Sequence, residues 1–220
     1  MYPSIKRFFD FLASAVVLLL LLPIFLPIAM LLRLTGEGAV IYLQERVGLK
    51  NKIFNIWKFA TMLKNSPNLG TGDVTLKEDP RVLPMGKFLR KTKINELPQL
   101  VNILRGDMSI VGARPLMKVS FDSYNNQVKS LIYNTRPGLT GIGSVVFRDE
   151  ESLIDQSDIP PREFYEKYII PHKGELEIWY QKNISFGTDL LIISLTVWVI
   201  LFSKSQLVYR IFPSLPKRHF

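Results

Sequence analysis

The longest apolar run of the chain lies near its N-terminus. Residues 11–32, FLASAVVLLLLLPIFLPIAMLL, carry no charged side chain, and the run is long enough to enter a bilayer. Pro23 and Pro27 lie near its middle, where each lacks an N–H and clashes with a carbonyl one turn earlier, so we expect a bend. Basic residues flank both ends, and the positive-inside tendency draws both flanks to the cytoplasm. The pattern favours a re-entrant helix-break-helix over the alternative of a kinked spanning helix, and a cleaved signal peptide is disfavoured because no A-x-A-like site follows.

A second apolar stretch, DLLIISLTVWVILF, occupies residues 189–202. It is short for a helix that crosses a bilayer. It predicts either a helix that lies in the membrane interface, with Trp198 at the depth of the headgroups, or a buried core helix.

Between these stretches the pattern of apolar and polar residues is mixed. The run KIFNIWKF, residues 52–59, alternates loosely enough to predict a short strand. Residues 64–80, KNSPNLGTGDVTLKEDP, are rich in Asn, Gly, Pro and Asp and predict a long loop.

A helix is predicted after this loop, because apolar residues recur at three- and four-residue steps, at Ile94, Leu97, Val101 and Leu104. Pro98 is tolerated only in a first turn, so the helix must start close to Asn95. Asn is a preferred N-cap, and the helix dipole stabilises Glu96 in the first turn. A helix cap alone could therefore explain the Asn-Glu pair.

Glycines and cations around this helix point to a second interpretation. Gly106 fits a left-handed C-cap, MSIV (residues 108–111) predicts a strand, and Gly112 would let the backbone approach a ligand closely. Arg114 offers a planar fork suited to phosphate oxygens, and a helix start binds anions through its free N–H groups. Three further cations lie nearby in the sequence: Arg90, Lys91 and Lys93. The cluster predicts a phosphate site.

Composition narrows the class of protein. The 220 residues, which suit one modest domain with an appendage, carry 28 Lys and Arg against 19 Asp and Glu, and 47% of them are apolar. A chain that is both basic and apolar indicates a membrane surface and makes a nucleic-acid binder a minority alternative. With no cysteine and with His172 and His219 far apart, thiolate chemistry and a histidine metal cage are disfavoured.

Residues 79–116, DPRVLPMGKFLRKTKINELPQLVNILRGDMSIVGARPL, closely resemble the core motif of the bacterial sugar transferase family, small membrane-bound phosphoglycosyl transferases. The stretches QERVG, WKFATM, RPGLTG and ELEIWYQKNISF follow the family's order and rough spacing.

The resemblance implies the fold and the location. It implies an α/β fold, mostly helical with a small sheet, with a re-entrant membrane segment (residues 1–35), a catalytic domain (36–188) and a C-terminal apolar interfacial segment with a basic tail (189–220). It also implies that the lipid bilayer is a partner and that the protein lies at the cytoplasmic face of the bacterial inner membrane.

The resemblance also implies the activity. Family members transfer a sugar 1-phosphate from a nucleotide sugar, here expected to be a UDP-sugar, to a polyprenyl phosphate such as undecaprenyl phosphate. They thereby start the assembly of membrane-linked glycan, and downstream glycosyltransferases are candidate partners. The family mechanism uses Mg²⁺ and an Asp-Glu dyad whose Asp attacks phosphorus.

This sequence departs from that dyad. Asn95 stands where the family has its nucleophilic Asp, and an amide is uncharged with its nitrogen lone pair held in resonance, so it is a poor nucleophile. Ala60 and Ala113 replace a base and a proline that the family usually has. The persistence of Glu96 and Arg114 indicates a coherent variant.

Three routes remain open. Glu96 is the nucleophile, or Glu150 or Glu151 supplies a replacement carboxylate, or the polyprenyl phosphate attacks the nucleotide sugar directly. The alternative to all three is a catalytically silent homologue that acts as a membrane-bound binding platform.

The expected site follows from these comparisons. Glu96 is assigned to metal or nucleophilic work, Asn95 to a cap whose carbonyl oxygen also holds the metal or phosphate, and Glu177, by the resemblance, to the metal site or else to the surface. The expected phosphate- and substrate-binding residues are Lys58, Arg90, Gly112, Arg114, Arg136 and Arg148.

Overall fold

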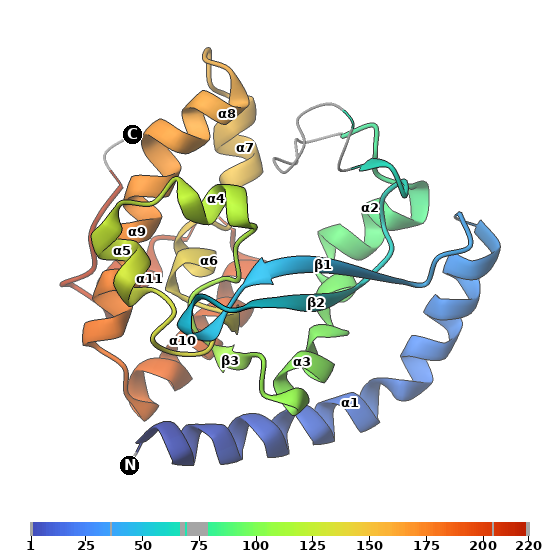
Figure 1. The fold of residues 1–220 in the computed structure, drawn as a ribbon, viewed down its shortest axis with the longest axis horizontal. Helices are drawn as coiled ribbons and strands as arrows, with labels where there is room; N and C mark the ends of the chain where they lie inside the picture. The colour runs from blue at the N-terminus through green and yellow to red at the C-terminus, as the bar shows by residue number, and fades with distance from the viewer. Residues whose placement is uncertain (1, 36, 67–68, 70–78, 204, 219–220) are drawn as a thin grey trace.

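The computed structural model describes residues 2–35, 37–66, 69, 79–203 and 205–218. These residues form a mostly helical chain with two small sheets, which confirms the predicted fold class. Figure 1 shows a long N-terminal helix along one edge of the molecule, a β-hairpin across its middle and most of the shorter helices gathered at one end.

Helix α1 spans Tyr2–Thr35 and runs without interruption through Pro23 and Pro27. Its course changes direction along its length (Figure 1), so the expected bend is present, and the helix continues through it although Pro23 and Pro27 have no N–H to donate. By length and composition α1 could cross a membrane, and most of its apolar side chains are exposed. The re-entrant course stays a prediction, because it concerns how the helix lies in a bilayer.

The first turns of α1 attach to the body of the protein through polar side chains. Arg7 donates hydrogen bonds to the last carbonyls of α3 (Gln99–Arg105), those of Ile103 and Leu104. Asp10 is buried, and one carboxylate oxygen accepts from the Ser109 hydroxyl at 2.7 Å while the other accepts from a β3 backbone N–H at 3.1 Å. Since β3 (Ser109–Val111) follows α3, α1 holds two consecutive elements.

Strands β1 (Ile41–Val47) and β2 (Ile53–Phe59) form an antiparallel hairpin, which confirms the strand predicted from KIFNIWKF. The connection includes a 3-10 turn, Leu49–Asn51, with positive φ at Lys50 and Asn51. Exposure alternates along β1, as period-two geometry requires of a strand with one covered face.

The segment after the hairpin contains α2 (Pro84–Lys91), a 3-10 turn at Ile94–Glu96, α3 and β3. Gly106 ends α3 with φ 91°, and β3 pairs in parallel with β4 (Gly138–Thr140), so the predicted C-cap and the strand in MSIV are confirmed. Most of the loop predicted for residues 64–80 lies outside the described residues, as does His219.

The remaining helices surround the largest apolar core. They are α4 (Lys118–Asp122), α5 (Asn126–Leu131), α6 (Ile142–Val146), α7 (Glu150–Asp155), α8 (Pro161–Phe164), a π-helical segment (Tyr165–Ile169), α9 (Ile170–Lys182), α10 (Phe186–Leu201) and α11 (Leu207–Ile211).

Helix α10 combines the two alternatives predicted for the second apolar stretch. Ile192, Leu195 and Val199 are buried in the core, whereas Val197 and Trp198 are among its exposed apolar side chains. The helix starts at Phe186, before the expected boundary at residue 189, because the Ser185 side chain caps it by accepting from the Thr188 N–H. It is a core helix with an apolar outer face.

Candidate active site

The Asn-Glu pair lies in a 3-10 turn, Ile94–Glu96, that precedes α3. The turn begins at Lys93, whose φ is 61°, and Pro98 occupies the N-cap position of α3. Asn95 is therefore no helix cap, and the N-cap prediction is wrong because the regular helix starts beyond Pro98. Only 4% of Asn95 is exposed, and its Oδ1 has no hydrogen-bond partner among the described residues. A buried oxygen without a partner is costly to a fold and marks a site for a ligand.

The Glu96 carboxylate is held by two cations. Arg114, in the loop after β3, donates from Nη2 to Oε1 at 2.8 Å and from Nη1 to Oε2 at 3.3 Å. The Nζ of Lys58, on β2, lies 3.9 Å from Oε1. This arrangement occupies both carboxylate oxygens with one planar guanidinium fork, a geometry for which Arg is suited.

Opposing effects set the protonation of this cluster. Burial by itself would raise the pKa of Glu96, but the charges of Arg114 and Lys58 outweigh it and hold that pKa well below the usual range. The carboxylate in turn raises the pKa of Arg114. Burial lowers the pKa of Lys58 well below its usual value, and the charge of Glu96 offsets part of that effect. Glu96 is therefore ionised at neutral pH.

Arg46 is a site residue that the sequence analysis did not assign. It lies on the covered face of β1, where its guanidinium donates to Gln44 and to the Pro115 carbonyl and its Nε has no partner among the described residues. Burial first, and then the charge of Arg114, lower the pKa of Arg46 to about 10. Arg46 lies in QERVG, one of the stretches that carry the family resemblance, and that was the sequence signal that would have found it.

Helix α7 and the residues just before it carry further charges that lie near the Asn95–Glu96 turn. Arg90 Nη2 lies 4.0 Å from an oxygen of Glu151, and Arg148 lies near enough to Lys93 to affect its charge. The structure thus gathers Lys58, Arg90, Arg114 and Arg148 of the predicted phosphate-binding set around Glu96.

Glu150 is engaged by a cation that the sequence analysis missed. Lys173, on α9, forms an ion pair with Glu150 at 2.5 Å, and its Nζ lies 5.4 Å from the ring centroids of both Phe147 and Tyr165. Burial opposes the charge of Lys173, but Glu150 raises its pKa overall. Nothing in the local sequence of α9 signals this pair, which depends on the packing of α7 against its neighbours.

Asn102 positions the hairpin against this turn. It is fully buried on α3, its Nδ2 donates to the Asn55 carbonyl at 2.8 Å, and its Oδ1 accepts from the Trp57 N–H at 2.9 Å. The side-chain amide thereby hydrogen-bonds to the backbone of β2 as a neighbouring strand would. Because Lys58 follows Trp57 directly, these two bonds fix where its side chain begins.

Two of the expected site residues lie elsewhere or have another role. Arg136 donates to the Gly106 carbonyl at 2.8 Å, at the far end of α3 from Glu96. A Cβ at Gly112 would lie 2.4 Å from the Arg136 carbonyl oxygen, so the close approach found there is to protein backbone. Their roles toward a ligand stay predictions.

Glu177 is not a surface carboxylate. It is 4% exposed on α9, accepts from the Gly143 backbone N–H, and has an Oε2 without a partner in the described part of the chain. Burial raises its pKa to about 7, with Lys173 opposing the shift. The surface alternative is wrong because α9 turns this side chain into the core.

The donors present suit a magnesium ion that shares its shell with substrate. Within the described residues, no group of three or more His, Asp or Glu side chains lies together, so a cage built of protein alone is absent there. Asn95 Oδ1 is a free buried oxygen, and the Glu96 carboxylate lies on the next residue. Mg²⁺ commonly takes one or two protein oxygens and completes its shell with water and phosphate. These two residues fit that requirement, and the metal role expected of Glu177 stays a prediction.

Comparison with known proteins adds two findings. Residues 1–203 match the family described as bacterial sugar transferase. The chain is 36% identical to the UDP-N-acetylgalactosamine-undecaprenyl-phosphate N-acetylgalactosaminephosphotransferase of Aeromonas hydrophila, with 91% of the chain and 44% of the relative covered.

Two other relatives match over the same share of the chain. A UDP-glucose:undecaprenyl-phosphate glucose-1-phosphate transferase of Klebsiella pneumoniae is 36% identical, with 91% of the chain and 41% of the relative covered. The exopolysaccharide production protein ExoY of Rhizobium meliloti is 32% identical, with 91% and 87% covered. The chain thus spans less than half the length of the first two relatives and most of the third.

Proposed function

The chain belongs to the bacterial sugar transferase family, and from this premise we propose that it transfers a sugar 1-phosphate from a nucleotide sugar to undecaprenyl phosphate. The observation that carries the proposal is the set of cations around the Asn95–Glu96 turn: Arg46, Lys58, Arg90, Lys93, Arg114 and Arg148. The names of the relatives indicate a UDP-sugar as the donor and undecaprenyl phosphate as the acceptor.

The charges explain how the site would bind these substrates. A nucleotide diphosphate sugar and a lipid phosphate are both anionic, and phosphoryl transfer depends chiefly on positioning and on neutralising the oxygens around phosphorus. Arg114 offers a guanidinium that is 41% exposed at the side chain, so it can contact a phosphate while it holds Glu96. Arg46 adds positive charge to the site, since its pKa of about 10 keeps it charged at neutral pH, and the Lys58 side chain, 15% exposed, lies 3.9 Å from Glu96.

Magnesium is proposed as the cofactor, held by Asn95 Oδ1 and the Glu96 carboxylate. When bound, the ion neutralises charge on the diphosphate and on the leaving phosphate. Asn95 would orient a phosphate or metal through its amide oxygen. Arg114 would keep Glu96 ionised and fixed in direction.

The membrane part of the proposal rests on α1 and α10. Both present exposed apolar side chains, and α1 is attached to α3 and β3, the elements that flank the site. This attachment would place the site at a membrane surface, where a polyprenyl phosphate exposes its headgroup. We place the protein at the cytoplasmic face of the bacterial inner membrane, because nucleotide sugars are cytoplasmic. The lipid-linked product would pass to downstream glycosyltransferases that extend a capsule, O-antigen or exopolysaccharide.

Transfer of label from a panel of UDP-sugars to undecaprenyl phosphate, in detergent with magnesium, tests the proposal. Wild type should form a lipid-linked product with at least one donor, and Glu96→Gln should reduce its formation. Glu163→Gln is the matched control, because Glu163 is an exposed carboxylate on α8. Failure of wild type to form product with every donor would contradict the proposal. No observation among the described residues favours the alternative of a silent binding platform, since the cations around Glu96 are in place.

A further inference from the structure

We propose that the lipid phosphate attacks the sugar-bearing phosphorus directly, in one step, with no sugar phosphate bound covalently to the protein. This inference rests on the proposed function and specifies its chemistry. It follows from the state of the residues that the sequence offers as nucleophiles at the turn and on α7: Asn95, Glu96, Glu150 and Glu151.

Asn95, at the centre of the turn, has no electron pair suited to attack phosphorus. Asn95 is 4% exposed, and its amide nitrogen is not basic, because its lone pair is delocalised into the carbonyl. Its Oδ1 is suited to accept a hydrogen bond or to bind a cation. Asn95 is therefore a positioning residue.

Glu96 is committed to structure. Both of its oxygens accept hydrogen bonds from Arg114, and Lys58 lies 3.9 Å from one of them. A metal ion can bind a remaining lone pair of these oxygens while the fork persists, whereas attack on phosphorus would turn one oxygen into an ester oxygen and remove the negative charge that pairs with Arg114. Removing one partner from a buried ion pair is strongly unfavourable.

The two carboxylates of α7 are no better placed. Glu150 pairs with Lys173, a cation enclosed by two aromatic rings. The side chain of Glu151 is 54% exposed and lies 4.0 Å from Arg90. An exposed carboxylate keeps its hydration shell and is not held in line with a phosphorus atom.

The excess of cations supports simultaneous binding of both substrates. In direct displacement the diphosphate of the donor and the phosphate of the acceptor occupy the site together, so their repulsion must be offset there. Arg46 and Arg114 both act on the one buried carboxylate of Glu96, which leaves positive charge to face the anionic substrates. A covalent route would need to neutralise only one substrate at a time.

The step balances without another reagent. An oxygen of the lipid phosphate uses an electron pair to form a bond to the sugar-bearing phosphorus. The bond from that phosphorus to the bridging oxygen breaks, and its electron pair leaves with the nucleoside monophosphate. The product is a lipid diphosphate sugar, and no oxidant, reductant or water is consumed.

Isotope exchange distinguishes this route from a covalent one. Labelled UMP is incubated with the UDP-sugar that serves as donor, with magnesium and without lipid acceptor, and label in UDP-sugar is measured. Wild type should show no exchange, while it forms product when acceptor is added, and double-reciprocal plots for the two substrates should intersect. Asn95→Asp is the positive control, because it restores a carboxylate at the centre of the turn and should exchange.

The outcomes separate the two proposals. Exchange without acceptor, parallel plots, or sugar phosphate retained on wild-type protein would overturn direct attack while leaving the transfer reaction in place. Absence of any lipid-linked product would overturn the proposed function, and direct attack with it.

A second, independent observation concerns residues 205–218, which we call the C-terminal strap. The match to the family ends at residue 203, and the strap lies beyond it. The strap nevertheless packs on the body: Val208, Phe212 and Leu215 are buried, and the Trp179 indole N–H donates to Ser214 at 3.0 Å. The C-terminal strap is therefore an integral part of the fold.

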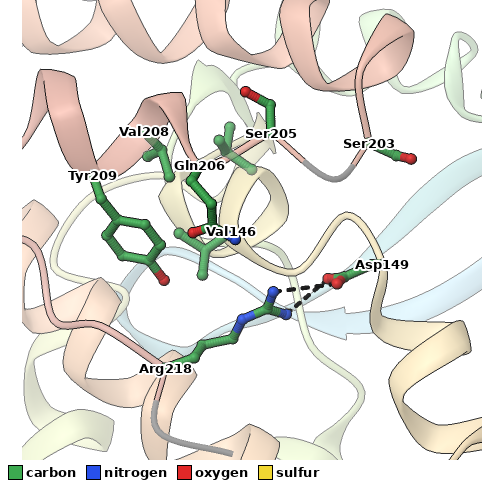
Figure 2. Close-up of a pocket in the computed structure, with 9 residues that line it drawn as sticks. Val146, Asp149, Ser203, Ser205, Gln206, Val208, Tyr209 and Arg218 are labelled. Atoms are coloured by element: carbon green, nitrogen blue, oxygen red, sulfur yellow. Dashed lines mark hydrogen bonds and ion pairs between the residues drawn. The ribbon is translucent and has the colours of Figure 1, made fainter.

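The strap reaches α7 through an ion pair. Figure 2 shows Arg218 pointing toward Asp149, with Nη1 to Oδ1 at 2.8 Å and Nη2 to Oδ2 at 3.2 Å. The guanidinium also lies 5.5 Å from the ring centroid of Phe147. Asp149 directly precedes α7, and its neighbours are Arg148 and Glu150, both of which belong to the charge cluster described above.

We infer that Arg218 is a positioning residue, which holds the start of α7 so that Arg148 can contact the donor. Arg218→Ala should raise the KM for the UDP-sugar about tenfold, since one charge-assisted contact to a phosphate is worth that order of affinity, with little change in kcat. Arg218→Lys should recover part of the loss because it keeps the charge. Arg210→Ala is the control, because Arg210 is an exposed arginine of α11 in the same strap.

A purely structural role predicts a different result. Equal loss of kcat with unchanged KM, or equal effects in Arg218→Ala and Arg210→Ala, would overturn the assignment. A lower thermal midpoint with unchanged KM would likewise overturn it, since the strap would then only stabilise the fold.

Discussion

Glu96 accepts a hydrogen bond from each terminal nitrogen of Arg114, at 2.8 and 3.3 Å. The pair joins the turn before α3 to the loop after β3, so the helix and strand between them form a closed segment. The cluster of cations depends on this closure, because the segment faces the hairpin that carries Lys58.

Loss of Arg114 should impair transfer more than loss of an exposed arginine. Arg114→Ala should lower the transfer rate by about 100-fold or more, since it removes a phosphate contact and leaves Glu96 without its partner. Arg114→Lys should be intermediate, because Lys keeps the charge and loses the planar fork. Arg105→Ala, whose side chain is 61% exposed, is the control and should stay near wild type in the radiolabel assay.

The amide of Asn102 should contribute measurably to stability. Asn102→Ala removes the partners of the Asn55 carbonyl and the Trp57 N–H inside the fold. The expected cost is about 1–3 kcal/mol, or a thermal midpoint lower by roughly 2–10 °C for a chain of this size. Asn134→Ala, at an exposed position, is the control in the same detergent. Equal midpoints for the two variants would contradict the role of Asn102.

Glu177 should make the protein less stable as the pH rises. Burial raises its pKa to about 7, so between its ordinary value near 4.5 and pH 7 the folded state binds a proton that the unfolded state has released. Stability from this group is complete below pH 4.5 and is lost as the pH rises to 7, by on the order of 3 kcal/mol. Lys173 is the cation that opposes the shift, and Tyr124, Tyr133 and Tyr180 face the same carboxyl.

Denaturant unfolding at several pH values checks this expectation. Glu177→Gln should remove the loss between pH 4.5 and 7 and should be more stable than wild type at pH 8. Glu163→Gln, an exposed carboxylate, should retain the wild-type dependence. Parallel curves for Glu177→Gln and wild type would contradict the buried proton.

A re-entrant α1 should have both ends on one side of the membrane. Because the chain has no cysteine, single cysteines can be introduced at Ser4 and Thr35, which are exposed at the two ends of α1. Each of these two cysteines should resist an impermeant maleimide in intact spheroplasts and should react with it after lysis. Ser130→Cys, which reports on the body of the protein, should behave in the same way. Reaction of one end in intact cells would show a spanning helix instead.

Sequence was sufficient for features that are set locally. β2, the left-handed Gly106 cap and the strand at residues 109–111 follow from alternation and from turn chemistry within a few residues. The sequence placed Glu96 and Arg114 in one motif but gave them separate roles, as a metal-binding or nucleophilic carboxylate and as a phosphate ligand, and it did not predict the bidentate pair that they form.

Features set by packing between distant elements were missed or wrong. Asn95 was predicted to be an N-cap because asparagine followed by glutamate is typical of a helix start. In the structure the chain forms a separate 3-10 turn before Pro98, and the regular helix begins after it. The pairing of Lys173 with Glu150 and the burial of Glu177 depend on how α9 rotates against α6 and α7, which no local pattern records.

Label transfer in wild type, Asn95→Ala and Asn95→Asp tests the central claim most directly, that this site transfers a sugar phosphate without a carboxylate at position 95. We expect wild type to form lipid-linked product and Asn95→Ala to retain transfer, lowered about 10- to 100-fold and partly recovered by more magnesium, as loss of one metal-orienting group would give. Silence in wild type with activity gained in Asn95→Asp would contradict the claim, because the site would then be intact but lack its nucleophile.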